Sequence, residues 1–184
     1  MSTTYQSKKS DGELSKMEWT DTLMLDITSA ANGSEPSSAM EFTRVVPLNG
    51  ITLLCASSKS RSETVAALKL LRGFRATGRR VVLCDTTQLV VGKQFGTEVV
   101  EHGSASLLIT CGISGREVGI GARDAGLDLG SVVVCSKATA GGQVLARQMA
   151  PGDTVLLLGL ESEACDEIVG TLSDVFAPHA VAAA

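Results

Sequence analysis

The sequence predicts an α/β fold of three layers, in which a mostly parallel sheet of about six strands begins with an antiparallel hairpin strand. Two β-rich segments joined by Asn49-Gly50, a series of later apolar runs, and helical stretches between those runs lead to this prediction. Strand and helix alternate from residue 42 to residue 176, which is typical of a sheet covered by helices on both faces.

Residues 1–41 precede this predicted domain, and we expect them to form a disordered or loosely attached tail because they are rich in Ser and Thr. Within them, Trp19–Ile27 contains apolar residues that fit either a strand or a helical face. This segment is interpreted either as a loosely attached arm or as a docking segment. Residues 177–184 are expected to be a second, C-terminal tail.

The strands are predicted from apolar runs. Phe42–Leu48 and Ile51–Cys55 flank Asn49-Gly50, the pair most typical of a type I′ hairpin turn. Four further runs are continuously apolar, which predicts strands that are buried on both faces: Val81–Cys84, Leu107–Thr110, Val132–Cys135 and Val155–Leu158.

Helices are predicted between the strands. The pairs Ser60/Glu63 and Ser114/Glu117 have the spacing of a capping box, in which each residue caps a backbone N–H of the other at a helix start. The first helix is expected to stop at Gly78. Residues 139–149 and a last apolar stripe from Cys165 to Phe176 predict two further helices.

Composition and charge exclude several function classes. The net charge of -4 and the low aromatic content of 3% argue against binding of nucleic acid or an anionic membrane. No apolar run is long enough to cross a bilayer, and no secretory signal is recognisable, so we expect a cytoplasmic protein. Five cysteines without a CxxC pair indicate reduced thiols.

Ligands of open α/β sheets bind beyond the carboxyl ends of the strands, so the loops at those ends are the candidate sites. Neither a dinucleotide fingerprint nor a P-loop string occurs in the sequence. The loop after Ile51–Cys55 is polar and basic and is a candidate anion site, although a solvated loop with a helix cap explains it as well; its residues are Ser57, Ser58, Lys59, Ser60 and Arg61.

The turn Gly112-Ile113-Ser114-Gly115 is a second candidate, because amide groups at a helix start can bind a phosphate or carboxylate. A tight strand-to-helix turn accounts for the same glycines. Ser114 and Gly115 are therefore candidate ligand-binding residues.

Four cysteines stand at predicted strand ends: Cys55, Cys84, Cys111 and Cys135. They can converge on a metal or redox site or act as small core residues, and core packing is the default because no CxxC half-site or histidine accompanies them. His102 and His179 are too isolated for a nucleophile–base relay. We therefore assign no catalytic residue and no metal ligand.

The stretch from Phe42 to Phe176 resembles the C-terminal, Rossmann-like domain of the Mur ligases, above all of the ligase that adds D-alanyl-D-alanine to the muramoyl tripeptide. The resemblance rests on Asn49-Gly50 before Ile51-Thr52-Leu53-Leu54, and on three later strings: Ser62-Glu63-Thr64-Val65-Ala66-Ala67-Leu68, Gly78-Arg79-Arg80-Val81-Val82-Leu83-Cys84-Asp85 and Gly152-Asp153-Thr154-Val155-Leu156-Leu157-Leu158-Gly159.

Mur ligases are three-domain enzymes that activate a carboxylate with ATP as an acyl phosphate, which an amine then attacks. The resemblance implies that this domain closes over a central ATP-bearing domain and helps to bind the amine substrate. The chain has no P-loop and no length for the other two domains, so ATP and Mg²⁺ are expected only if a partner chain supplies the central domain.

The sequence departs from the family pattern at the strand-end loops. The family's Asp-Ser-Tyr-Asn-Ala-Asn-Pro is replaced by Cys55-Ala56-Ser57-Ser58-Lys59-Ser60-Arg61, and its Lys-Gly-Ser-Arg by Leu158-Gly159-Leu160-Glu161. The second loop, Cys84–Val90, keeps the acid of Gly-Asp-Met-Leu-Glu-Leu-Gly and loses its Glu. Asp85 and Gly159 are the positions that carry over, and both are candidate ligand-binding residues.

These observations predict a stand-alone, non-catalytic domain of this type that binds an amino acid, a muramoyl peptide or a ligase partner protein. Two alternatives stay open. The chain can be the amine-substrate subunit of a split ATP-dependent ligase, or it can be a self-associating structural protein that forms a homo-oligomer.

Overall fold

The structure is a computed structural model, and it describes residues 43–58, 60–89 and 91–176. The expectations for the tails, for Trp19–Ile27, for Lys59 and for His179 lie outside these residues. Across the described ranges, no helix is long and apolar enough to cross a membrane.

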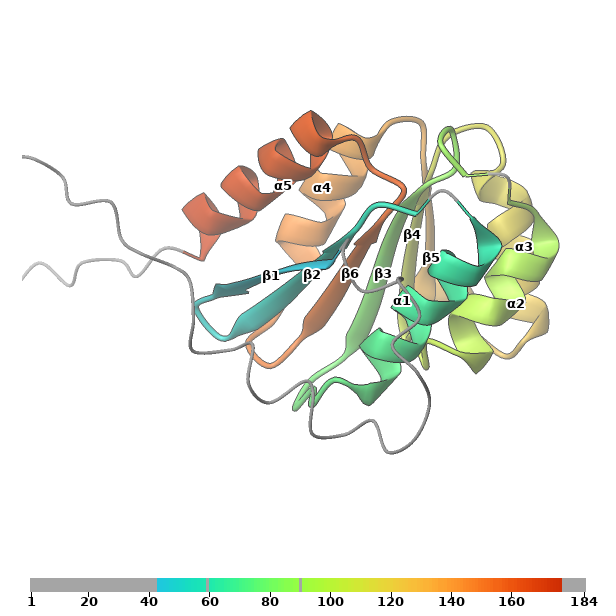
Figure 1. Cartoon of the computed structure of the whole chain (residues 1–184), viewed down its shortest axis with the longest axis horizontal. Helices are drawn as coiled ribbons and strands as arrows, with labels where there is room; N and C mark the ends of the chain where they lie inside the picture. The colour runs from blue at the N-terminus through green and yellow to red at the C-terminus, as the bar shows by residue number, and fades with distance from the viewer. Residues whose placement is uncertain (1–42, 59, 90, 177–184) are drawn as a thin grey trace, which may run out of the picture. The chain divides into compact units, whose positions relative to one another are not determined.

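The described residues form an α/β fold with a six-stranded sheet and five α-helices (Figure 1). The strands are β1 (Thr43–Leu48), β2 (Ile51–Ala56), β3 (Arg80–Asp85), β4 (Leu107–Cys111), β5 (Val132–Cys135) and β6 (Thr154–Leu158). The helices are α1 (Arg61–Gly73), α2 (Lys93–Glu101), α3 (Gly115–Asp124), α4 (Ala138–Gln148) and α5 (Ser162–Val175).

The strand order is β1-β2-β6-β3-β4-β5, and every neighbouring pair is parallel except β1 and β2. The predicted mostly parallel sheet with an antiparallel entry hairpin is therefore confirmed. Asn49 and Gly50 both have positive φ, 25° and 90°, as a type I′ turn requires. The insertion of β6 between β2 and β3 places the last strand at the centre of the sheet, beside the first parallel strand.

Two apolar cores lie on opposite faces of the sheet. One core packs alternate residues of the strands, such as Leu54, Val82 and Leu156, against α1, α2 and α3. The other packs Leu53, Leu83 and their neighbours against α4 and α5. Figure 1 shows these helices as separate layers on the two sides of the sheet. Strands that are buried from both sides need apolar residues at every position, which explains their continuously apolar sequences.

β5 does not follow the prediction that all four later runs are buried on both faces. It is the last strand in the sheet order, and its Val134 side chain is 51% exposed. An edge strand lacks a neighbour on one side and is only partly covered by a helix, so its apolar sequence does not guarantee burial.

The capping box at Ser60/Glu63 is confirmed, but the one predicted at Ser114/Glu117 is wrong. Ser114 has φ -88° and ψ 2° in place of the extended backbone of a capping residue, and its side chain makes no cap hydrogen bond. The first helix also ends at Gly73, earlier than the predicted stop at Gly78, because Phe74 takes an extended backbone. The Arg80 side chain donates hydrogen bonds to the carbonyls of Leu71 and Phe74 at that end.

Candidate functional site

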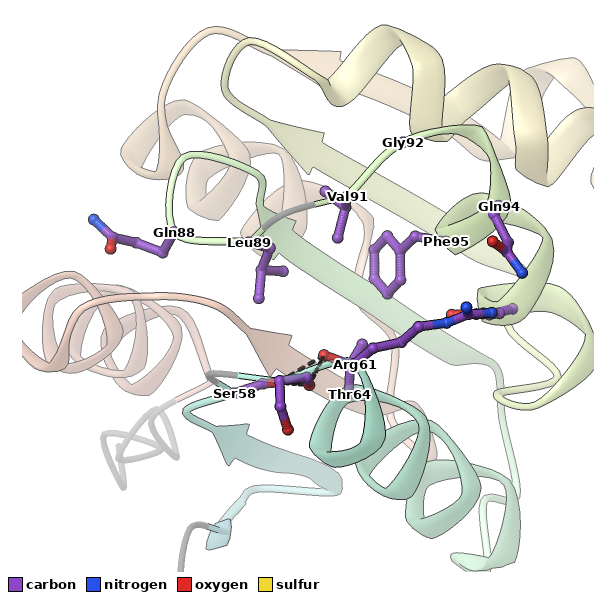
Figure 2. Close-up of a pocket in the computed structure, with 11 residues that line it drawn as sticks. Ser58, Arg61, Thr64, Gln88, Leu89, Val91, Gly92, Gln94 and Phe95 are labelled. Atoms are coloured by element: carbon purple, nitrogen blue, oxygen red, sulfur yellow. Dashed lines mark hydrogen bonds and ion pairs between the residues drawn. The ribbon is translucent and has the colours of Figure 1, made fainter.

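A pocket lies at the carboxyl ends of the strands, between the start of α1 and the loop from β3 to α2 (Figure 2). It holds about 630 Å³ of empty space, which includes the solvent at its mouth. Its lining comes from three segments: Ser58, Ser60, Arg61 and Thr64; Gln88, Leu89, Val91 and Gly92; and Gln94, Phe95 and Glu98. Its position follows the general rule for ligand sites in open α/β sheets.

The wall from α1 is built by hydroxyl groups that hydrogen-bond one another. The hydroxyls of Ser58 and Thr64 are 2.6 Å apart, and they lie 2.9 Å and 3.0 Å from the Ser60 carbonyl oxygen. Because each hydroxyl has one proton, one of them donates to the carbonyl and the other donates to its hydroxyl neighbour. The Ser60 side chain in turn accepts from the Glu63 amide and completes the capping box. This local network fixes the first turn of α1 and aims its polar groups at the pocket.

Arg61 and Glu98 form the ion pair of the pocket. Glu98 is only 6% exposed, and its Oε1 accepts a hydrogen bond from Arg61 Nε at 2.9 Å and another from Nη2. The Arg61 side chain is 65% exposed and extends across the pocket toward α2 (Figure 2). The charge of Arg61 is therefore matched inside the protein by a buried carboxylate.

The opposite wall combines apolar side chains with two amides. Figure 2 shows Leu89, Val91 and Phe95 on the side of the pocket across from Arg61 and Thr64. Gln88 and Gln94 are exposed, and the Gln88 amide donates to Glu161 at 2.9 Å. Gly159 supports this wall, because a Cβ on it would lie 2.6 Å from Leu89 Cγ, and its φ of 68° also favours glycine.

The predicted site residues do not all meet at this pocket. Ser58, Ser60 and Arg61 line it, whereas Ser57 is exposed and is not among its lining residues. The Asp85 side chain accepts hydrogen bonds from the Thr87 amide at 2.9 Å and the Thr87 hydroxyl at 2.7 Å. Asp85 thus shapes the loop that carries Gln88 and Leu89, and it is not among the lining residues.

Ser114 and Gly115 lie at the start of α3, apart from this pocket. The Ser114 amide donates to the Thr86 hydroxyl at 3.2 Å, and the Gly115 amide donates to the Gly112 carbonyl at 3.2 Å. Both amides are used by protein acceptors. Anion binding at this turn stays a prediction.

The four strand-end cysteines do not come together at one site. β6 separates Cys55 on β2 from Cys84 on β3, whereas Cys111 and Cys135 are register partners on β4 and β5. Across the described ranges, no group of three or more His, Cys, Asp or Glu residues is arranged to hold a metal ion. Burial and the neighbouring Cys135 raise the pKa of the Cys111 thiol to about 12, and burial raises the pKa of Cys84. Both thiols stay protonated near neutral pH, so neither is an activated nucleophile.

The sequence reasoning missed the contribution of α2, which supplies Gln94, Phe95 and Glu98. Phe95 and Val99 have the spacing of an apolar helical face, which could have revealed this helix. The pairing of Glu98 with Arg61, 37 positions away, depends on how two helices pack and has no local signal.

Comparisons with known proteins place this fold among Mur ligase domains. A domain of a Haemophilus ducreyi protein described as a UDP-N-acetylmuramate:L-alanyl-gamma-D-glutamyl-meso-diaminopimelate ligase matches with a TM-score of 0.51 at 14% identity. The match covers 73% of this chain and 98% of that domain. The fold thus resembles the Mur ligase C-terminal domain, as the sequence resemblance implies; no specific member of the group is singled out.

Two longer enzymes also match. The MurF ligase from Thermotoga maritima, solved with ADP, has a TM-score of 0.50 at 14% identity, and the match covers 72% of this chain and 30% of that enzyme. The murein peptide ligase Mpl from Psychrobacter arcticus has a TM-score of 0.51 at 12% identity, with 71% and 29% covered. This chain therefore spans about three tenths of these two enzymes. No protein-family model and no curated protein sequence matches it.

Proposed function

We propose that this chain is a Mur-ligase C-terminal-like domain that binds a ligand without transforming it. The ligand class is an amino acid or a muramoyl peptide, related to the precursors that Mur ligases join. The proposal finds support in the fold similarity and in the changes at the strand-end loops, where the family's acid, asparagines and basic pair are replaced.

The observation that carries the proposal is the character of the pocket at the ends of the strands. Among the lining residues that the structure describes, the one charged pair, Arg61 with Glu98, is internally matched, and the other groups are hydroxyls, amides and apolar side chains. Such a lining suits the paired donors and acceptors and the short side chains of an amino acid or peptide. It offers little to a triphosphate, which binds where amides and cations are left unmatched.

Binding is tested by thermal shift with D-alanyl-D-alanine, single D-amino acids, a muramoyl tripeptide and ATP. We expect the unfolding midpoint to rise by about 5 to 10 °C with a peptide or amino acid at about 100 times its Kd, because a ligand of the folded state stabilises it by about 2.7 kcal/mol. ATP is expected to leave the midpoint unchanged.

The pocket variant Gln94→Ala is expected to weaken the ligand's effect. The matched control is Gln143→Ala, an exposed glutamine on α4 on the other side of the sheet. Equal shifts in both variants would place binding elsewhere. Phosphate release from ATP in the presence of a muramoyl peptide and an amino acid would contradict the non-catalytic role, and its loss in Asp85→Ala would assign it to this chain.

A further inference from the structure

Within the described residues the sheet ends at two edges, β1 and β5, and these edges are not equivalent. β1 carries Pro47, which has no N–H to offer a further strand, and its Arg44 side chain is paired with Asp166 of α5 at 2.8 Å. β5, with the sequence Val-Val-Val-Cys, ends the strand order on the other side and contains no proline or charge. Proline and charged side chains are the features that protect sheet edges from further pairing. β5 is therefore the less protected edge.

The backbone of β5 is arranged to accept another strand. The Val133 carbonyl faces β4, where it accepts a hydrogen bond from the Thr110 hydroxyl at 3.4 Å. The N–H and C=O of one residue point to the same side of a strand, and this side alternates along the strand, so Val134 directs both groups to the open edge. Val132 directs its carbonyl there, whereas its N–H donates to the Leu129 carbonyl. The exposed side chains of Val134 at 51% and Leu129 at 68% add apolar area beside these groups.

Helix α3 gives this edge a basic border. Its Gly115 and Gly119 lie against Val134 and Val132, so the helix sits close above β5. Arg116, Ile120 and Arg123 follow at i, i+4 and i+7 and form one exposed face of α3.

The other charged side chains near β5 show which end of the edge is basic. Lys137 follows β5 at the same end as Arg116, whereas Asp124 of α3 is paired with Lys93 of α2. Asp128 lies at the opposite end, in the turn before β5. The carboxyl end of β5 is therefore the basic end of the edge.

We propose that the β5 edge binds an extended segment of a partner protein as an additional strand, and that this segment has an apolar centre and acidic residues at the end beside the carboxyl end of β5. The backbone of that segment would pair with Val134 and with the Val132 carbonyl. Its apolar side chains on the α3 face would cover Val134 and Ile120, and the acids at its end would meet Arg116 and Lys137. A second copy of this chain fits less well, because two-fold pairing would set the basic face of each α3 against its own equivalent.

The probe is a synthetic, fluorescently labelled peptide of about ten residues with a valine-rich centre and aspartate or glutamate at the end that would lie beside Arg116 and Lys137. Binding to the full chain is followed by fluorescence anisotropy and by the amide NMR signals of Val132 and Val134. We expect saturable binding that is lost when the acids are replaced by lysine. It should also be lost when alternate backbone amides of the peptide are methylated.

The decisive variant is Arg116→Glu combined with Lys137→Glu. Both positions are exposed and lie at helix starts, where an acid is favourable, so the fold should be preserved. We expect affinity to fall about tenfold, whereas the control Arg147→Glu on α4 should leave it unchanged.

Three results would overturn the proposal. These are absence of peptide binding, equal binding by the double variant and the control, and a dimer of the free chain in sedimentation that excludes the peptide. The last result would assign the edge to a second copy. The proposal is independent of the pocket, because Gln94→Ala is expected to leave peptide binding unchanged.

Discussion

The two ends of the parallel sheet differ in how their polar groups are used. At the amino end of β3 and β6, a buried acid ties two loops together, and polar groups there find their partners within the protein. At the carboxyl end of the same strands, polar side chains border a pocket. The same strands thus support a closed end, at the buried acid, and an open end, at the pocket.

Asp153 organises the closed end. It is 2% exposed and accepts hydrogen bonds from the Arg79 amide at 2.7 Å, from Arg79 Nη2 at 2.8 Å and from the Ala150 amide at 3.0 Å. The Gly78 amide donates to the Gly152 carbonyl at 2.8 Å beside it. At the open end the corresponding buried acid is Glu98. It forms its ion pair with Arg61, whose side chain is largely exposed.

Among the substitutions that test this difference between the two ends, Asp153→Ala should change the free energy of unfolding most. The substitution leaves the Arg79 and Ala150 amides without their acceptor, and we expect a loss of about 3 kcal/mol in the free energy of unfolding, measured by urea denaturation. The affinity of the folded fraction for its pocket ligand should not change. Gln88→Ala at the open end is the control, with an effect of less than about 0.5 kcal/mol. Equal losses in both variants would abolish the distinction between the two ends.

The same substitution at two glycines gives the next largest contrast. A Cβ on Gly78 would lie 2.6 Å from Asp153 Oδ1 and 2.8 Å from the Gly152 carbonyl carbon, so Gly78→Ser should cost about 2 kcal/mol. A Cβ on Gly92 meets Glu117 at 3.5 Å, and serine there can cap α2. Gly92→Ser should therefore change the free energy of unfolding by less than about 0.5 kcal/mol. A cost at Gly92 equal to that at Gly78 would show that the open end is as tightly packed.

Acid should weaken the closed end. Burial alone would raise the pKa of Asp153, but hydrogen bonds from Arg79 and from the Ala150 amide lower it below its ordinary value of 3.8. A lowered pKa in the folded state means that the stabilisation is present above pH 3.8 and is lost as the pH falls through the folded-state pKa.

We therefore expect the stability difference between the wild-type chain and Asp153→Asn to be constant near neutral pH and to shrink in strong acid. Urea denaturation at a series of pH values measures it. The matched variant Glu161→Gln, at an exposed acid of the open end, should change stability by less than about 0.5 kcal/mol throughout. A difference for Asp153→Asn that grows as the pH falls would contradict the assignment of its pKa shift.

The fold was predictable because its signals are local. Asn49-Gly50 specifies the turn, the apolar runs specify the strands, and Ser60 with Glu63 specifies a helix start. The prediction failed where the same local pattern stands in a different setting. Ser114 and Glu117 have the spacing of a capping box, but the turn after β4 gives Ser114 a backbone that cannot use it.

The candidate site was predicted in part. Ser58, Ser60 and Arg61 were identified because they follow the first parallel strand, and ligands bind at such ends. Gln94, Phe95 and Glu98 were not identified, because they reach the pocket only through the packing of α2 beside α1. Asp85 bonds within its own loop, whereas the Ser114 amide donates to Thr86, 28 positions away, and neither residue is among the pocket lining. The Ser114 partner is set by the tertiary structure.

The amino-acid sequence by itself determined the alternation of strands and helices, the hairpin turn and the resemblance to a known ligase domain, since each depends on neighbouring residues in the chain. Tertiary structure alone decided the strand order, the pairing of Arg61 with Glu98 and the exposure of the β5 edge. These features depend on which elements become neighbours in space, and that choice is made by the packing of two whole apolar cores at once.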